Sequence, residues 1–206
     1  MNSVHLKWSN VKGFYFLLNK SSVKLNMYDK PIDFSQQWLD SDTEIFVEDE
    51  ALHVHKAVLI LQSPVFKKML CSEFKEKVDQ RIALPGKTKA SVVEMLKQIY
   101  PNPPKFTENS DIEPLLKLAR EYQIDILMKK IEKELLRRPT NIDTLVLAQE
   151  FSLDKLAEKC ISTISRNSFN TAKHHPKYKL LSSDNIVKIS EAHINFLYTK
   201  FQINWS

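Results

Sequence analysis

The fold is decided by residues 41–70, which read SDTEIFVEDEALHVHKAVLILQSPVFKKML. Residues 43–47 and 51–55 both alternate between apolar and polar side chains, and the acidic residues 48–50 between them form a turn of hairpin length. Ser63 and Pro64 follow as a helix cap and a proline with a preset φ at the first helical position. This stretch therefore predicts a β-hairpin with one apolar face, and then a helix that ends at Leu70.

Downstream of this stretch the pattern becomes mainly helical. Residues 81–84 (RIAL) predict a third short strand, which Pro85 and Gly86 end. The apolar spacing beyond them predicts a helix before Pro101, two helical hairpins in series up to residue 167, and a weaker helix from Ser182 to about Tyr198. The N-terminal caps of these helices are predicted at Thr88, at Ser110 with Glu113, and at Asp125, Asn141 and Ser152.

The segment upstream is harder to interpret. Residues 1–31 mix aromatic residues and lysines without clear periodicity, although residues 14–18 suit a strand. Residues 32–39 carry an incomplete helical stripe that is a candidate for packing outward onto a partner.

The composition is that of a folded, soluble protein, with 43% hydrophobic and 27% charged residues among 206. Short strands followed by paired helices fit an α+β fold. Only Gly13 and Gly86 are glycines, which argues against phosphate-binding loops and dinucleotide fingerprints. Cys71 and Cys160 stand far apart, as expected of free thiols in the cytosol or nucleus. The apolar run near the start is too short for a signal peptide or a membrane span, so we expect no export and no membrane anchor.

No pattern in the chain indicates catalysis, a cofactor or a metal. His53 and His55 have a spacing that can place two imidazoles around zinc, but further ligands with suitable spacing are missing. No serine lies in a nucleophile-elbow sequence. The formal charge of +5 is spread among acidic residues without a basic stripe, so we do not expect nucleic-acid binding, which would weaken steeply with added salt. We therefore expect a protein that is not an enzyme.

Three separated stretches resemble the BTB/POZ family in the correct order. They are residues 41–47 (SDTEIFV), 52–59 (LHVHKAVL) and 63–70 (SPVFKKML), and the resemblance continues through Tyr100 and residues 115–122 (LLKLAREY). Several motifs in order are more specific than any one of them. The resemblance assigns residues 32–137 to a BTB/POZ domain and implies a small three-stranded sheet flanked by helical hairpins.

The resemblance also implies a homodimer built on the N-terminal segment and the first core helix. The matching positions for this dimer interface are Phe34, Trp38, Leu39, Val58 and Leu61. The alternative is that these side chains only fill the core of the monomer, and for Val58 this alternative is at least as well founded. Trp38 is the better anchor, because large desolvated aromatic residues concentrate binding energy.

The loop after the Ser-Pro helix contains Phe74-Lys75-Glu76, which resembles the motif by which many BTB adaptors bind cullin-3, the scaffold of a ubiquitin ligase. An apolar side chain would enter a pocket while the carboxylate accepts hydrogen bonds beside it. Chance is the competing explanation, since the loop is rich in Lys and Glu. Phe74, Glu76 and Tyr100 are the predicted cullin-binding residues.

Residues 138–206 resemble the helical extension, called 3-box or BACK-like, that follows the BTB domain in such adaptors. The structural alternative is that this extension merely packs on the domain. The whole pattern predicts a homodimeric cullin-3 adaptor that presents an unidentified client protein for ubiquitination. The alternative is a BTB dimerisation scaffold or transcriptional co-regulator that does not bind cullin-3.

Overall fold

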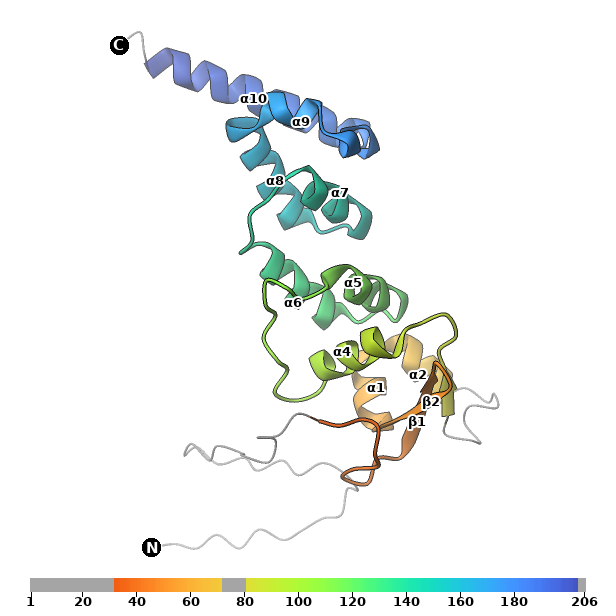
Figure 1. The fold of residues 1–206 in the computed structure, drawn as a ribbon. Helices are drawn as coiled ribbons and strands as arrows, with labels where there is room; N and C mark the ends of the chain where they lie inside the picture. The colour runs from red at the N-terminus through yellow and green to blue at the C-terminus, as the bar shows by residue number, and fades with distance from the viewer. Residues whose placement is uncertain (1–31, 72–80, 204–206) are drawn as a thin grey trace, which may run out of the picture. The chain divides into compact units, whose positions relative to one another are not determined.

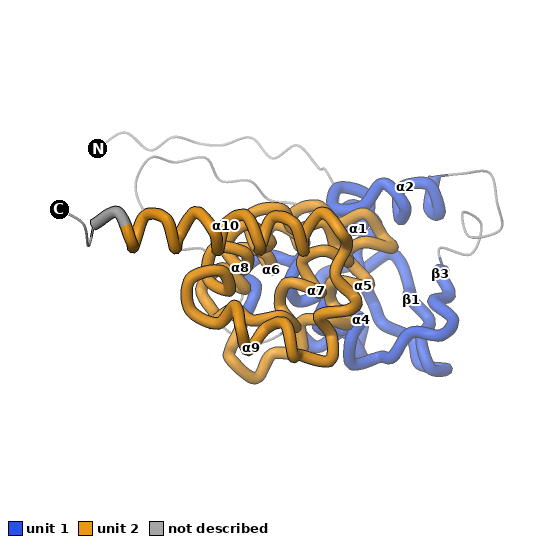
Figure 2. The backbone as a smooth tube through the Cα atoms, turned by 90° about the horizontal axis from the view of Figure 1, so that it is seen from above, with its two compact units in different colours: residues 1–104 blue, residues 105–206 orange. Residues whose placement is uncertain are grey.

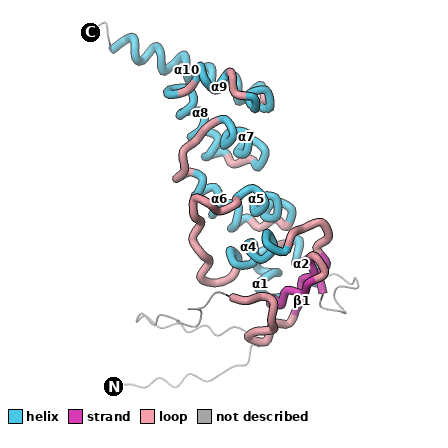
Figure 3. The backbone as a smooth tube through the Cα atoms, viewed as in Figure 1, coloured by secondary structure: helices cyan, strands magenta, loops and turns pink. Residues whose placement is uncertain are grey.

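The computed structural model describes residues 32–71 and 81–203, and the chain divides into two compact units, 1–104 and 105–206 (Figure 2). The strand expected at residues 14–18 lies outside the described residues. Figure 1 gives the element labels, and Figure 3 separates helices, strands and loops along the chain. The described strands all belong to the first unit, and the second unit is helical in its described part.

The first unit contains the predicted three-stranded sheet, in the order β2-β1-β3. Its strands are β1 (Thr43–Val47), β2 (Glu50–Val54) and β3 (Arg81–Ala83). β1 and β2 pair antiparallel across the acidic turn, where Glu48 and Asp49 both have positive φ, as a two-residue hairpin turn of the primed types requires. β3 pairs with β1 in parallel and is reached by the longer connection that parallel strands need. The predicted hairpin and third strand are confirmed.

Three described helices complete the first unit: α1 (Lys56–Gln62), α2 (Pro64–Cys71) and α4 (Lys89–Ile99). The caps predicted at Ser63 and Thr88 are confirmed, because their side chains accept the backbone N–H groups of Phe66 and Ser91. Strands and helices together supply the buried apolar core, which includes Ile45, Leu52, Leu59, Phe66, Ile82, Val92 and Leu96.

Residues 32–39 form turns rather than a helix. Asp33 accepts hydrogen bonds from both the N–H and the hydroxyl of Ser35, which closes a local turn. Leu39 and Asp40 then adopt left-handed backbone conformations with φ of 42° and 53°. A helical stripe does not describe this segment, because its backbone reverses direction before β1.

The second unit contains the two predicted helical hairpins. The first pairs α5 (Ile112–Glu121) with α6 (Asp125–Leu135), and the second pairs α7 (Ile142–Phe151) with α8 (Asp154–Asn167). Leu156, Cys160 and Ile164 are buried along α8, as their spacing predicts. The guanidinium of Arg120 lies 5.3 Å from the ring centroid of Phe151, which links α5 to α7.

The second unit continues with α9 (Phe169–Lys173), a 3₁₀ turn η1 (Pro176–Leu180) and the long helix α10 (Ser183–Ile203). The predicted last helix is confirmed and is longer than expected. Its His193 ring stacks on Phe169 with centroids 3.8 Å apart, and Nδ1 lies 2.6 Å from the carbonyl oxygen of Ser165. These contacts hold α10 beside the end of α8.

Three predicted helix caps, those at Ser110, Asp125 and Ser152, were wrong. Ser110 closes a turn with the N–H of Thr107 instead of capping α5. Asp125 is the first helical residue of α6 and makes no side-chain cap, since Ile124 occupies that position. Ser152 ends α7 in a left-handed conformation, and the carboxylate of Glu132 on α6 accepts the N–H of Leu156 near the start of α8.

Among the described residues, no helix combines the length and the apolar character that crossing a bilayer demands.

Asn141 offers a direct test of local capping. Its side-chain oxygen accepts hydrogen bonds from the N–H and the hydroxyl of Thr144 at 2.9 and 3.0 Å. Asn141→Ala should lower the free energy of unfolding by about 1 kcal/mol, measured by urea denaturation followed by circular dichroism. The matched control is Asp111→Ala at the N-cap of α5, where no side-chain cap exists and the change should stay below about 0.5 kcal/mol. Equal losses in both variants would contradict the assignment.

Candidate functional site

An aromatic cluster in the first unit joins the N-terminal turn to the sheet and to the end of α4. It consists of Phe34, Trp38, His55 and Tyr100. The Phe34 and Tyr100 ring centroids are 5.2 Å apart at 74°, and those of Trp38 and His55 are 5.0 Å apart at 88°. Both pairs have the edge-to-face geometry that aromatic rings prefer. The cluster therefore fixes the path of residues 34–38 against the rest of the unit.

His55 is the most constrained member of the cluster, because both ring nitrogens and its backbone N–H have partners. Nε2 lies 2.8 Å from the carbonyl oxygen of Leu39, the N–H donates to the Tyr100 hydroxyl at 2.8 Å, and Nδ1 lies 3.3 Å from that hydroxyl. A carbonyl only accepts, so Nε2 carries a proton, and in the neutral ring Nδ1 accepts from the Tyr100 hydroxyl. The ring thereby holds the left-handed Leu39 turn beside the start of α1.

This arrangement leaves apolar side chains on the surface of the first unit. Leu39 is 52% exposed at the turn, and Leu61 on α1 is 80% exposed. Ala57, one turn before Leu61, is also exposed, whereas Val58 and Leu59 on the opposite side of α1 are buried. We call these three exposed residues, Ala57 and Leu61 on α1 and Leu39 in the turn bonded to the N-cap residue of α1, the α1 surface. Its apolar exposure is what a partner would cover.

The predicted dimer residues therefore fall into two groups. Leu39 and Leu61 belong to the α1 surface, and Trp38 is half-buried. Phe34 and Val58 are buried inside the chain, where they act as core residues in this single copy. A direct role of Phe34 and Val58 in a dimer stays a prediction. The α1 surface is defined without these two residues.

The predicted cullin-binding residues are also separated. Phe74 and Glu76 lie outside the described residues. Tyr100 is only 3% exposed, and its hydroxyl is engaged by His55. A direct contact between Tyr100 and cullin-3 stays a prediction, but the role that the structure gives this side chain is to support the Leu39 turn through His55.

The charged groups near the α1 surface have structural partners. Asp42 accepts the backbone N–H of Lys56 at 2.7 Å and so caps α1. Glu44 lies 3.0 Å from Arg81 and 3.8 Å from His53 beside a polar hollow of about 250 Å³. His53 thus lies beside a carboxylate, and His55 takes part in forming the Leu39 turn. The part of the chain that the structure describes holds no group of three potential metal ligands.

The two thiols differ in environment. Cys160 is fully buried in α8, and burial raises the pKa of its thiol to about 11. It is therefore protonated at neutral pH and unsuited to act as a nucleophile. Cys71 is exposed at the end of α2.

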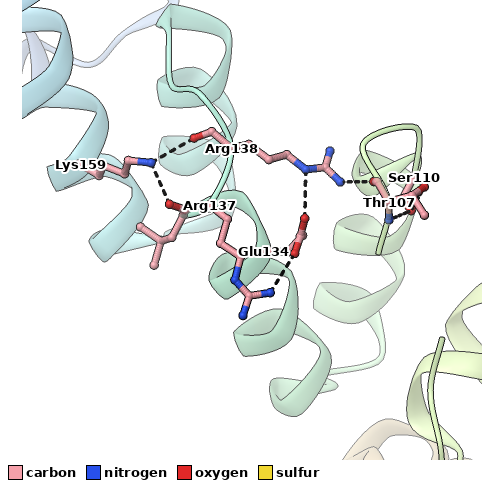
Figure 4. A network of polar contacts seen from close by, with 7 residues as sticks. Thr107, Ser110, Glu134, Arg137, Arg138 and Lys159 are labelled. Carbon is pink, nitrogen blue, oxygen red and sulfur yellow. Dashed lines mark hydrogen bonds and ion pairs between the residues drawn. The ribbon is translucent and has the colours of Figure 1, made fainter. Parts of the chain in front are cut away.

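A polar network in the second unit joins the two helical hairpins (Figure 4). The ammonium of Lys159 on α8 donates to the carbonyl oxygens of Leu136 and Arg138 at 2.8 and 3.0 Å. Arg138 reaches back to the carbonyl of Thr107 at 2.6 Å and lies 3.5 Å from Glu134. The end of α6 is thus held by α8, although residues 137 and 138 were the predicted boundary between domain and extension. Sequence reasoning missed this role of Lys159.

A family model for the BTB/POZ domain matches residues 32–139, more than half of the chain. The chain belongs to the BTB/POZ domain family. The match spans the sheet, the α1 surface and the helices through α6, so the fold implied by the sequence motifs is confirmed. The BTB/POZ domain is a protein-interaction module, which agrees with a candidate site made of apolar surface rather than of reactive groups.

The names of the relatives of this BTB/POZ chain refer to different further domains. It is 31% identical over 144 residues to BTB and MATH domain-containing protein 36 of Caenorhabditis elegans, covering 68% of this chain and 45% of the relative. BTB and MATH domain-containing protein 38 of the same organism is 31% identical over 62% of this chain and 33% of the relative. Kelch-like protein 24 of Rattus norvegicus is 24% identical over 75% and 26%. The chain spans less than half the length of these relatives.

The Tyr100 hydroxyl provides a test of the BTB/POZ site. Tyr100→Phe removes the acceptor of the His55 N–H and the donor to Nδ1, and should lower the free energy of unfolding by about 1–2 kcal/mol in urea denaturation. Tyr198→Phe is the matched control, because Tyr198 is 66% exposed and its loss of one hydroxyl should change stability by less than about 0.5 kcal/mol. Unchanged stability in Tyr100→Phe would contradict the supporting role of this side chain.

Proposed function

We propose that this chain is the BTB part of a homodimeric substrate adaptor of a cullin-3 ubiquitin ligase, and that its work is binding rather than catalysis. The observation that carries the dimer is the α1 surface, in which Leu61 is 80% exposed on the first core helix of a BTB/POZ domain. The observation that carries the cullin contact is the sequence Phe74-Lys75-Glu76 between α2 and β3. The ubiquitin transfer itself would take place on other subunits.

The α1 surface has the character of an interface centre. It is apolar and lies on a short helix that the buried residues Val58 and Leu59 hold in place. The left-handed Leu39 turn, held by His55, adds a second exposed apolar side chain beside the start of that helix. A two-fold contact would bring the same surface from both copies together, and an interface of ordinary size buries roughly 800 Å² per partner.

The cullin contact would use the loop that follows α2. Phe74 would supply the apolar side chain and Glu76 the carboxylate, and both are close in sequence to the well-packed α2, whose Phe66 and Leu70 are buried. The hairpin of α7 and α8 follows the BTB/POZ domain directly. Lys159 ties this hairpin to the end of α6, so the extension can present a continuous surface with the last BTB helices.

Dimerisation would couple these surfaces. A dimer would bind two cullin-3 molecules and would have two client-binding sites. Once a client is bound at one site, the high effective concentration of the second site, rather than the affinity of one site, would govern client capture. The identity of the client is open.

Leu61→Asp tests the dimer. Burying an unpaired carboxylate at the centre of an apolar interface should weaken self-association by about 2 kcal/mol or more, which is about 30-fold in the dissociation constant. Sedimentation velocity over a concentration series measures this change. Leu180→Asp is the control, because Leu180 is 53% exposed in the second unit and its substitution should leave self-association unchanged. A monomeric wild-type chain would reject the dimer.

Phe74→Ala tests the cullin contact. In calorimetric titrations of the chain against the N-terminal domain of cullin-3, the loss of an anchoring aromatic side chain should weaken binding by about 2 kcal/mol, or about 30-fold. Glu76→Ala should weaken it as well, because the carboxylate accepts hydrogen bonds from the partner. Lys75→Ala, between the two, is the matched control and should change the affinity by less than about threefold.

The same titration separates the proposal from its alternative. A BTB dimerisation scaffold or transcriptional co-regulator would show the Leu61-dependent dimer but no binding to cullin-3 at tens of micromolar. That combination would remove the ligase from the proposal while leaving the dimer intact.

A further inference from the structure

A groove runs between α8 and α10 in the second unit, and none of its lining residues was assigned to the dimer interface or to the cullin contact. The two helices lie against each other, and the hollow beside their contact has a volume of about 680 Å³. Its apolar lining comes from Ile161 on α8 and from Ala192 and Phe196 on α10, each only half-buried. A concave apolar surface of this size is typical of binding sites for compact ligands or peptide side chains.

Charges of both signs line this groove, namely Arg166, Lys188 and Glu158. The ammonium of Lys200 lies 5.9 Å from the ring centroid of Phe196 and adds a further cation next to the apolar lining. A carboxylate on an apolar occupant would therefore find a cationic partner at this groove wherever the cation is not already paired.

Arg166 is the cation that is available to a ligand. Lys188 is already paired with Asp184 at 2.7 Å, whereas Arg166 is exposed and has no hydrogen-bond or ion-pair partner among the described residues. Its planar guanidinium matches a carboxylate with two parallel hydrogen bonds. The groove thus places one unengaged carboxylate-binding group next to an apolar lining.

We propose that the α8/α10 groove binds an acidic amphipathic peptide segment of a partner protein. One or two large apolar side chains of the segment would contact Ile161, Ala192 and Phe196, and an Asp or Glu beside them would pair with Arg166. The inference rests on the proposed function in one respect, namely that the segment belongs to the client of the adaptor.

Selection from a random dodecamer peptide library displayed on phage, with the full chain as bait, tests the groove without knowing the partner. The enriched peptides should combine aromatic or leucine residues with Asp or Glu. In fluorescence anisotropy, their affinity should fall at least about tenfold in Arg166→Glu, which loses the cation and repels the carboxylate, and in Ala192→Trp, which fills the groove.

Lys155→Glu is the matched control for charge, because Lys155 is exposed on α8 but does not line the groove. It should change the affinity by less than about threefold. Arg166→Glu alters a solvent-exposed side chain, so it remains informative if Ala192→Trp fails to fold. The affinity for wild type should also fall with added salt, since the charged contact is screened.

Other outcomes would overturn the inference. They are the absence of enriched peptides, enrichment of peptides without acidic residues, or equal binding by wild type and Arg166→Glu. A change in the sedimentation of the chain alone caused by Ala192→Trp would show that a second copy covers the groove instead.

Titration of cullin-3 separates the two proposals. Loss of peptide binding in Arg166→Glu with intact cullin-3 binding supports the groove as an independent site. Intact peptide binding in a chain that does not bind cullin-3 would reject the ligase assignment alone.

Discussion

Every helix begins with backbone N–H groups that have no partner within the helix, and in this protein remote carboxylates satisfy several of them. Asp42 accepts the N–H of Lys56 at the start of α1, Glu48 in the hairpin turn accepts that of Lys89 at the start of α4, and Glu132 serves α8. Each of these bonds attaches a distant part of the chain to the first turn of a helix. The negative charge also interacts favourably with the positive end of the helix dipole.

The same requirement explains how the α1 surface is formed. The N–H of His55, the N-cap residue of α1, donates to the hydroxyl of Tyr100 at the end of α4. The imidazole of His55 in turn bonds to the carbonyl oxygen of Leu39 and fixes its position. Leu39 can then keep a left-handed backbone, which costs energy for a residue with a Cβ. The exposed position of Leu39 therefore follows from the hydrogen bond that holds its carbonyl at the His55 ring.

The sequence predicted best those features that depend on neighbours along the chain. Alternation over residues 43–55 gave both strands of the hairpin, and local hydrogen bonding made Asn141 and Thr88 correct as caps. Ser152 misled because a serine before a helical stripe is usually a cap, whereas here it ends α7 with a positive φ without a glycine. The family motifs implied a three-stranded sheet, but its order, β2-β1-β3, came from the structure.

What the sequence did not predict are contacts between residues that are distant along the chain. Tyr100 matched a family position, but nothing local indicates that its hydroxyl meets His55, 45 positions earlier. The exposure of a side chain also depends on residues that are distant along the chain. Phe34 and Leu39 are both apolar residues of one short segment, yet Phe34 is buried and Leu39 is exposed. Candidate interface residues could therefore be named from motifs, but their division into core and surface needed the structure.

Lys159 shows how far such non-local bonding reaches in the second unit. Its ammonium satisfies two carbonyls at the end of α6, and hydrogen bonds to a charged donor contribute about 2 kcal/mol each when they are sheltered from water. The helix that supplies this lysine also supplies Ile161 and Arg166 to the groove with α10. A displacement of α8 would therefore alter the end of α6 and the groove together.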